Sequence, residues 1–322
     1  MKIVIAGGSG YLGRNLANWL TARDHEVVVL TRGSRAGRGA VRYILWDGET
    51  VRDWAAELDG ADAVVNLAGR TVNCRYNATN RRDILESRLR STGAIGQAIA
   101  QVSKPPAVWL NASSATIYRH ALDRPIDERT GDIGHGFSVD VCQQWERELD
   151  DAVVTRTRRV ALRSAMVFGP GEGGVFDAFR ALVRRGLGGA MGNGEQYVSW
   201  IHAEDFCRAI QWLLNHDDLS GPVNLASPNP LPNREFMRIL RESMGVRFGL
   251  PAARWMLEIG AFFLRTETEL LLKSRRVVPG RLLKSGFTFL YPEWRDAAAD
   301  ILSRNSGRPP IRQESSGQRD KV

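Results

Sequence analysis

A glycine-rich turn close to the amino terminus is the first place where residue types and spacing indicate chemistry. The turn reads Gly7-Gly8-Ser9-Gly10-Tyr11-Leu12-Gly13 and lies between a β-branched run at residues 2–6 and an amphipathic segment. Between a strand and a helix, such glycines permit a tight turn and a close approach of the backbone to a pyrophosphate. The N–H groups at the helix start favour that anion. We therefore expect Gly7, Gly10, Tyr11, Leu12 and Gly13 to contact a dinucleotide; the alternative is an ordinary turn that happens to be rich in glycine.

The end of the second expected strand, residues 26–31, decides which dinucleotide fits. A site for NAD usually places Asp or Glu there, about 20 residues beyond the glycine turn, to bind the ribose 2′-OH. Here Thr31 is followed by Arg32, and no carboxylate is present. A guanidinium suits a 2′-phosphate, through charge-assisted hydrogen bonds that are often bidentate. The sequence thus predicts NADP(H), and the alternative for Arg32 is a solvated turn residue.

Polar and small residues follow three later strands and complete the expected cleft. Asp47, after the third strand, is placed to accept a hydrogen bond from the adenine amino group. The fourth strand ends in Asn66-Leu67-Ala68-Gly69, where small residues let the backbone approach ribose and phosphate. The fifth ends in Asn111-Ala112-Ser113-Ser114, which puts hydroxyls near the nicotinamide end. The order of these strand ends agrees with one ligand lying across them.

Strand-like and helix-like segments alternate over the first two-thirds of the chain. This alternation predicts an α/β fold, a Rossmann-like, doubly wound parallel sheet with right-handed crossovers. The expected strands span residues 2–6, 26–31, 42–46, 63–67, 107–113, 159–167 and 223–225. The longest expected helix runs from about residue 80 to 101, with apolar positions at helical intervals. A second amphipathic helix is expected at residues 175–185, between glycine-rich loops.

We expect residues 1–230 to form the dinucleotide-binding domain, with loops 169–200 contributing to the substrate side. Residues 231–304 are predicted to form a smaller, mainly helical C-terminal domain with a short strand at 287–290. Residues 305–322 are poor in apolar side chains, which predicts a disordered tail.

Composition narrows the classes of protein further. The chain has 322 residues, of which 43% are hydrophobic and 25% charged, as is ordinary for a globular protein. It begins with a strand rather than a signal peptide and shows no bilayer-length apolar run, so we expect a cytoplasmic protein without membrane association. The three cysteines lack metal-ligand spacing, which predicts reduced thiols and no metal. The net charge of +8 is scattered, which favours a small anionic ligand over nucleic acid.

Several motifs together resemble the extended short-chain dehydrogenase/reductases. They are the glycine turn, the strand end at 66–69, Ser113-Ser114-Ala115-Thr116-Ile117-Tyr118 and Trp200-Ile201-His202-Ala203-Glu204-Asp205. More narrowly, residues 1–303 resemble the atypical "epimerase family" branch, which carries a C-terminal domain of unknown function. That match rests on short motifs at residues 84–88, 142–146, 187–189, 199–202, 219–224, 228–230 and 281–283. The resemblance implies that the cofactor touches Thr31, Arg32, Leu67, Ala68, Arg88 and Val167.

The chain departs from this family at its catalytic pair. Short-chain reductases carry Tyr-x-x-x-Lys, in which the Tyr transfers a proton and the Lys lowers the Tyr pKa and holds the ribose. The corresponding segment here places Ser138 at the Tyr position and Cys142 at the Lys position. A serine hydroxyl does not replace the phenol without an activating partner. Ser114 matches the family's substrate-orienting Ser/Thr, so it is our candidate catalytic residue.

Two functions follow from this pattern. The first is an NADP(H)-dependent oxidoreductase or epimerase-like enzyme that acts on a small polar substrate of nucleotide-sugar type. In that interpretation, Arg75-Tyr76 in the loop after the fourth strand are candidates to hold an anionic or sugar-like group. The alternative is a non-catalytic NADP(H)-binding redox sensor, regulator or scaffold. The absent Tyr and Lys favour the alternative, whereas Ser114 and the C-terminal segment favour the enzyme.

Overall fold

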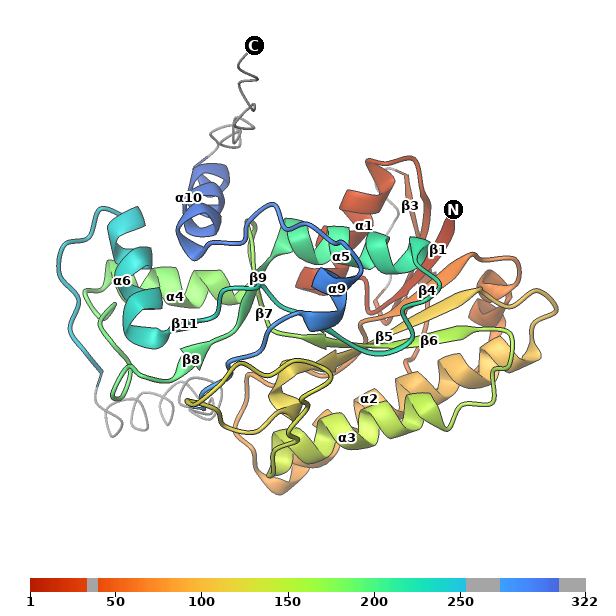
Figure 1. The fold of residues 1–322 in the computed structure, drawn as a ribbon. Helices are drawn as coiled ribbons and strands as arrows, with labels where there is room; N and C mark the ends of the chain where they lie inside the picture. Colours follow the sequence, from red (N-terminus) through yellow and green to blue (C-terminus); the bar gives the residue numbers. More distant parts are fainter. Residues whose placement is uncertain (34–39, 253–272, 307–322) are drawn as a thin grey trace, which may run out of the picture.

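A seven-stranded parallel sheet forms the centre of the protein (Figure 1). The structure, a computed structural model, describes residues 1–33, 40–252 and 273–306. The sheet's strands are β1 (Lys2–Ala6), β2 (Glu26–Thr31), β3 (Val41–Leu45), β4 (Ala63–Asn66), β5 (Val108–Ser114), β6 (Arg158–Ser164) and β10 (Gly221–Leu225). Their order is β10-β6-β5-β4-β1-β2-β3, so the direction of winding reverses between β1 and β4. Ligands bind outside the carboxyl ends of the strands at such a switch point. The predicted doubly wound fold is confirmed.

Helices cover both faces of this sheet. Those beside it are α1 (Tyr11–Thr21), η1 (Asp53–Leu58), α2 (Ala78–Gln101), α3 (Phe137–Asp150) and α5 (Ala203–Asn215). The helices α2 and α3 lie together along one face, and α1 and α5 lie on the other (Figure 1). A hydrophobic core lies on each face of the sheet, and successive strand residues point alternately into one core and the other. Ile3 and Ile5 face α1 and α5, and Val4 faces α2 and α3. The helix α2 begins two residues earlier than predicted because the Asn77 side chain caps it, accepting from the Asn80 N–H at 2.8 Å.

The expected single strand at residues 159–167 is wrong, because the chain changes sheet within it. The strand β6 ends at Ser164, and β7 (Met166–Phe168) pairs instead with β9 (Trp200–His202). A second small sheet joins β8 (Tyr197–Val198) to β11 (Leu231–Pro232). A continuous apolar run shows that a strand is buried, but it does not show which neighbour the strand pairs with.

The helices α6 (Asn233–Ser243) and α10 (Trp294–Asn305) pack on α4 (Val175–Arg184) through an aromatic core. The short helix α9 (Gly280–Lys284) packs instead on β10, with Leu282 in the core beside the large sheet. The Phe168 ring lies 5.4 Å from Phe236 and 5.0 Å from Trp294, so residues on both sides of position 230 share this core. The boundary drawn at 230 stays a prediction. Of the predicted tail at residues 305–322, Asn305 is the last residue of α10, and residues 307–322 lie outside the described residues.

The short strand expected at residues 287–290 does not form. The buried Asp205 carboxylate, in the first turn of α5, accepts the backbone N–H groups of Leu290 and Tyr291, each at 2.8 Å. A side chain thus takes the hydrogen bonds that a neighbouring strand would have made. This contact fixes the path of the chain between α9 and α10.

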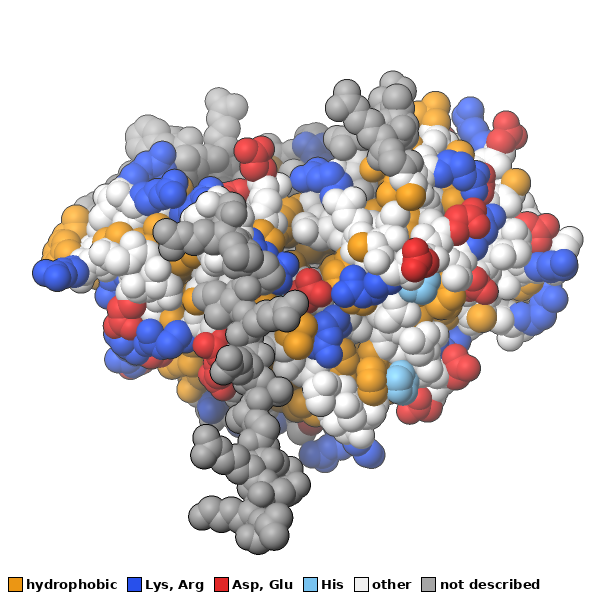
Figure 2. Space-filling view, turned by 90° about the horizontal axis from the view of Figure 1, so that it is seen from above, with side chains coloured by type: hydrophobic (Ala, Val, Ile, Leu, Met, Phe, Trp, Pro, Cys, Tyr) orange, Lys and Arg blue, Asp and Glu red, His pale blue; other side chains and the backbone are white. Residues whose placement is uncertain are grey.

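Part of the scattered positive charge is structural. Arg159 Nη1 donates to the carbonyls of Leu149 and Asp150, at 3.1 and 2.6 Å, and so satisfies the carboxyl end of α3. Arg158 donates likewise to the Leu213 carbonyl, at 2.8 Å, in α5. On the face drawn in Figure 2, basic side chains alternate with acidic ones. None of the described helices has the length and apolar composition needed to cross a bilayer.

Candidate functional site

The glycine turn opens α1 at the carboxyl end of β1, and its geometry requires glycine. Gly7 has a φ of 75°, and a Cβ there would lie 2.8 Å from the Ala68 backbone. A Cβ on Gly13 would lie 2.3 Å from the Cα of Gly8. Gly10 differs, because it is exposed and a Cβ there would meet only the Gly7 carbonyl, at 3.5 Å. No side chain caps α1 at Gly10, so the N–H groups of its first turn are available to an anion.

The side chain of Tyr11 holds a second glycine loop, residues 169–174, against this turn. Its hydroxyl donates to the Pro170 carbonyl at 3.2 Å, and its ring packs on Gly174. Burial raises the pKa of Tyr11 to about 12, so the phenol stays neutral. Arg14 reinforces the junction by donating to the Ser9 carbonyl at 2.8 Å and the Glu172 carbonyl at 3.2 Å. The side chain of Tyr11 therefore positions the loop, and the predicted cofactor contact is left to its backbone.

The ends of β2 and β3 place the predicted adenosine contacts at one corner of the sheet. Thr31 is buried, and Arg32 next to it is exposed. Asp47 accepts the N–H groups of Glu49 and Thr50, both at 2.9 Å, and also bonds the Thr50 hydroxyl. The Thr50 hydrogen bonds lower the pKa of Asp47 to about 2. The Asp47 carboxylate thus stabilises the turn at residues 47–50, and it remains charged and exposed.

A buried network of side-chain amides fixes the backbone turn that follows β4. Asn66 Oδ1 accepts the Ala68 N–H at 3.0 Å, and Asn66 Nδ2 donates to Asn111 Oδ1 at 2.7 Å. These bonds fix the Leu67–Ala68 turn against Gly7. The predicted strand-end contacts of β1 and β4 therefore lie side by side at the switch point.

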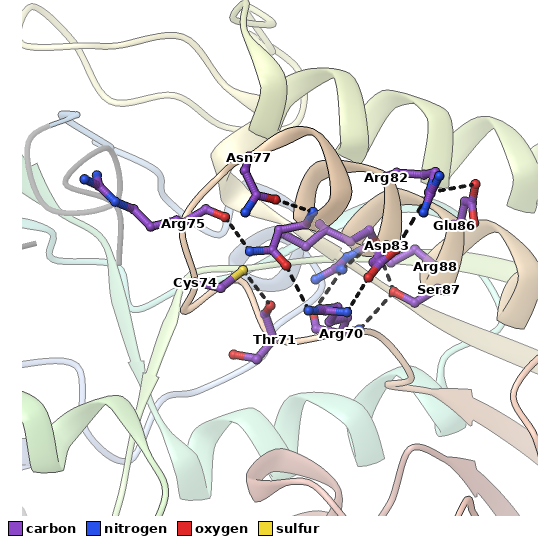
Figure 3. A network of polar contacts seen from close by, with 12 residues as sticks. Arg70, Thr71, Cys74, Arg75, Asn77, Arg82, Asp83, Glu86, Ser87 and Arg88 are labelled. Atoms are coloured by element: carbon purple, nitrogen blue, oxygen red, sulfur yellow. Dashed lines mark hydrogen bonds and ion pairs between the residues drawn. The ribbon is translucent and has the colours of Figure 1, made fainter. Parts of the chain in front are cut away.

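The loop after Gly69 is tied to α2 by a polar network (Figure 3). The Arg70 guanidinium pairs with Asp83 and donates to Asn80 Oδ1 at 2.9 Å. Asn80 Nδ2 donates in turn to the Arg75 carbonyl, at 2.7 Å. The Arg75 side chain points away from this network, as Figure 3 shows. These contacts fix the base of the loop to α2.

The predicted contact Ser113 belongs to a buried ion-pair network between β5, β6 and α3. Its hydroxyl donates to Glu146 Oε1 at 2.6 Å. Arg163 bonds the same carboxylate through two nitrogens, at 2.8 and 2.7 Å, and also donates to the Tyr118 hydroxyl at 3.0 Å. Tyr118 donates to Asn224 Oδ1 at 2.8 Å. This network was missed in the sequence because its members are far apart along the chain.

The expected catalytic positions of α3 bring neither a phenol nor a cation to the site. Ser114 bonds Thr116, whose hydroxyl lies 3.9 Å from Cys142 Sγ. Cys142 is buried, and burial raises its pKa to about 11, so the thiol is neutral at physiological pH. Ser138 lies in the first turn of α3. Val167, in β7, has its side chain in the apolar core beside the sheet.

The fold and these strand ends together define a Rossmann-type protein built to bind a nicotinamide dinucleotide. The chain belongs to the NAD dependent epimerase/dehydratase family, which matches residues 3–226. Residues 252–301 match a Domain of unknown function (DUF1731). The resemblance drawn from the sequence is thereby confirmed.

Relatives of similar length are named epimerase family proteins. The human protein SDR39U1 is 31% identical over 309 residues, which span 94% of this chain and 100% of that protein. A Mycobacterium leprae relative is 33% identical over 310 residues, 95% of this chain and 96% of its own. The crystal structure of human SDR39U1 with NADPH superposes with a TM-score of 0.83 and covers 94% of this chain and 99% of that one, at 31% identity. A nucleoside-diphosphate sugar epimerase from Corynebacterium glutamicum gives 0.75 at 26% identity, covering 94% of this chain and 58% of that one. The expectation of a nicotinamide dinucleotide is confirmed by the family, and the choice of NADP(H) agrees with the NADPH in that relative.

Proposed function

We propose that this protein is an NADP(H)-dependent oxidoreductase or epimerase-like enzyme that acts on a small polar substrate. The observation that carries the proposal is the uncapped start of α1 at Gly10, beside a strand end that offers Arg32 and no carboxylate. The first feature binds a pyrophosphate and the second a 2′-phosphate. When bound, the dinucleotide supplies hydride transfer, and the protein supplies orientation and electrostatics.

Each residue set has a distinct task in this proposal. Gly7, Gly10, Gly13 and the backbone of Tyr11 and Leu12 receive the pyrophosphate. At the adenosine end, Thr31, Arg32 and Asp47 contact ribose phosphate and adenine. Toward the nicotinamide end the contacts are Leu67, Ala68, Gly69, Arg88, Ser113 and Val167. Ser114, at the end of β5, orients a carbonyl or hydroxyl of the substrate. The neutral Cys142 thiol is excluded as a nucleophile because burial keeps it protonated.

A substrate of nucleotide-sugar type is the finer part of the proposal. It is supported by the family and by the nucleoside-diphosphate sugar epimerase to which the chain is similar. Three free cysteines in the described structure agree with a reducing compartment such as the cytoplasm. The second candidate function is a non-catalytic NADP(H) sensor or scaffold, and the observation that favours it is an α3 without Tyr and Lys.

Turnover separates these two functions. The purified protein is incubated with NADPH and a panel of carbonyl compounds, including nucleotide-linked keto sugars, and the loss of reduced-nicotinamide absorbance is followed. We expect oxidation with at least one substrate, lowered about tenfold or more by Ser114→Ala because a positioned hydrogen bond is lost. Tight NADPH binding with no oxidation across the panel would establish the sensor instead.

The cofactor choice rests on Arg32. Arg32→Ala is expected to weaken NADPH binding about 10- to 100-fold, since hydrogen bonds to a charged group contribute about 1.5–3 kcal/mol. NADH, which lacks the 2′-phosphate, should bind with unchanged affinity. Calorimetry on both cofactors measures the ratio, with Arg156→Ala as the control because this exposed arginine precedes β6, at the amino ends of the strands. An unchanged ratio would show that Arg32 does not contact the 2′-phosphate.

A further inference from the structure

Arg88 is a partly buried cation for which the described structure offers no carboxylate. Its Nη1 donates to two backbone carbonyls, of Ile84 at 2.8 Å and of Arg70 at 3.1 Å. Burial lowers the pKa of Arg88, and the described groups that counteract this are Cys142 and Tyr76. An enclosed guanidinium without an acidic partner is costly for the fold, so it points to a ligand or a reacting group that supplies the negative charge.

Arg88 lies near the α3 position at which the family carries its lysine. Its guanidinium carbon lies 5.0 Å from the Trp145 ring centroid and within electrostatic reach of Cys142, which holds the Lys position in α3. On its other side it packs on Gly69, where a Cβ would lie 3.3 Å from that carbon. Arg88 thus lies between the end of β4 and α3, beside the strand end that faces the dinucleotide.

Tyr76 packs its ring on the residue that precedes the position at which the family carries its tyrosine. Its ring meets Phe137 edge-on, with centroids 5.0 Å apart, and Phe137 directly precedes Ser138 at the Tyr position. The Arg81 guanidinium covers the same Phe137 ring at 4.9 Å, and Arg81 Nε donates to the Tyr76 carbonyl at 2.8 Å. The loop network of Arg70 and Asn80 holds the segment that carries Tyr76 against α2 (Figure 3).

We propose that Tyr76 and Arg88 together do the work of the absent Tyr-x-x-x-Lys pair, Tyr76 as the proton donor and acceptor and Arg88 as the cation that stabilises its phenolate and holds the nicotinamide ribose. The pair comes from the loop after β4 and from α2, whereas the family's pair comes from the helix that is α3 here. This inference rests on the proposed enzymatic function.

The reaction balances with the proposed cofactor as the reductant. The carbonyl carbon of the substrate accepts a hydride from the reduced nicotinamide, and its C=O π bond opens. The carbonyl oxygen takes the proton of Tyr76 Oη, which gives an alcohol, an oxidised nicotinamide and a phenolate beside Arg88. The phenolate regains its proton from water, and the reverse direction uses the phenolate as the base.

The pair is tested with Tyr76→Phe, Arg88→Met and Arg88→Lys on the full-length protein, with Tyr43→Phe and Arg90→Met as controls. Tyr43 lies in β3 at the far edge of the sheet, and Arg90 is an exposed residue of α2 that pairs with Glu49 and Glu86. The first readout needs no substrate: the ultraviolet absorbance of phenolate is titrated, and the Tyr76 signal is the difference from Tyr76→Phe. This signal should move to higher pH in Arg88→Met and return toward its original position in Arg88→Lys. A Tyr76 titration that falls at the same pH in the wild type and in Arg88→Met would overturn the proposal.

The second readout is kinetic, on any carbonyl that the wild type reduces. Tyr76→Phe should lower kcat about 100-fold or more while NADPH affinity stays within twofold, as expected for a lost general acid. Arg88→Met should lower both kcat and NADPH affinity. Full kcat in Tyr76→Phe would refute the pair and leave the proposed enzyme intact. A wild type that reduces nothing would refute the enzyme, and the absorbance titration would still report whether Arg88 stabilises the phenolate.

Discussion

Replacement of Glu146 by alanine is expected to lower the free energy of unfolding by about 3–5 kcal/mol, the effect of leaving one partner of a buried ion pair uncompensated. Glu146 and Arg163 are 13% and 9% exposed, and the pair is doubly hydrogen-bonded. The same substitution removes the carboxylate to which the Ser113 hydroxyl donates, and it leaves Tyr118 as the remaining side-chain partner of Arg163. The loss therefore spreads across β5, β6 and α3.

Urea denaturation of the variant measures this loss directly. Gln143→Ala, an exposed position on the same helix, serves as the control and should stay within about 0.5 kcal/mol of the wild type. The double replacement Glu146→Leu with Arg163→Met should recover much of the stability, because no unpaired charge remains. A loss below about 1 kcal/mol in Glu146→Ala would show that this network does not hold the end of β5.

Gly13→Ala should weaken NADPH binding and also lower the stability of the fold. The new Cβ would lie 2.3 Å from the Cα of Gly8, so the turn must open and α1 must move from β1. Such overpacking costs about 1–3 kcal/mol of folding free energy. Displacement of the first-turn N–H groups should weaken NADPH binding at least about thirtyfold, or about 2 kcal/mol.

Gly10→Ala separates the two effects. Its φ of −73° is ordinary, and the added Cβ meets only the Gly7 carbonyl, at 3.5 Å. The melting temperature should therefore stay close to that of the wild type, while NADPH affinity falls because the methyl group occupies the approach of the pyrophosphate. If Gly13→Ala binds NADPH normally, the anion site is not at this turn.

Local patterns in the sequence were sufficient to predict most of the sheet. The strands β1 and β2 have the predicted bounds because β-branched runs of five or six residues between turn signals leave little choice. The change of sheet after Ser164 and the use of Asp205 in place of a strand at 287–290 depend on partners far along the chain. Such contacts leave no periodicity to detect.

The candidate site divides in the same way. The predicted dinucleotide contacts lie at strand ends, which the order of a parallel sheet brings together. The Tyr-x-x-x-Lys signature is readable because both residues share one helix face, and its absence was equally readable. The proposed pair of Tyr76 and Arg88 has no such spacing, and it was inferred from the way α2 and the loop before it pack against α3. The signals available in the sequence were the Arg88 match to the family and the place of Arg75-Tyr76 in the loop after the fourth strand.

The most direct test of the account is a calorimetric titration of the wild-type protein with NADPH and, separately, NADH. We expect one NADPH bound per chain, with an affinity at least about tenfold above that for NADH. The absence of binding heat at millimolar NADPH, or equal affinity for the two cofactors, would contradict a phosphorylated dinucleotide held between the start of α1 and the Arg32 strand end.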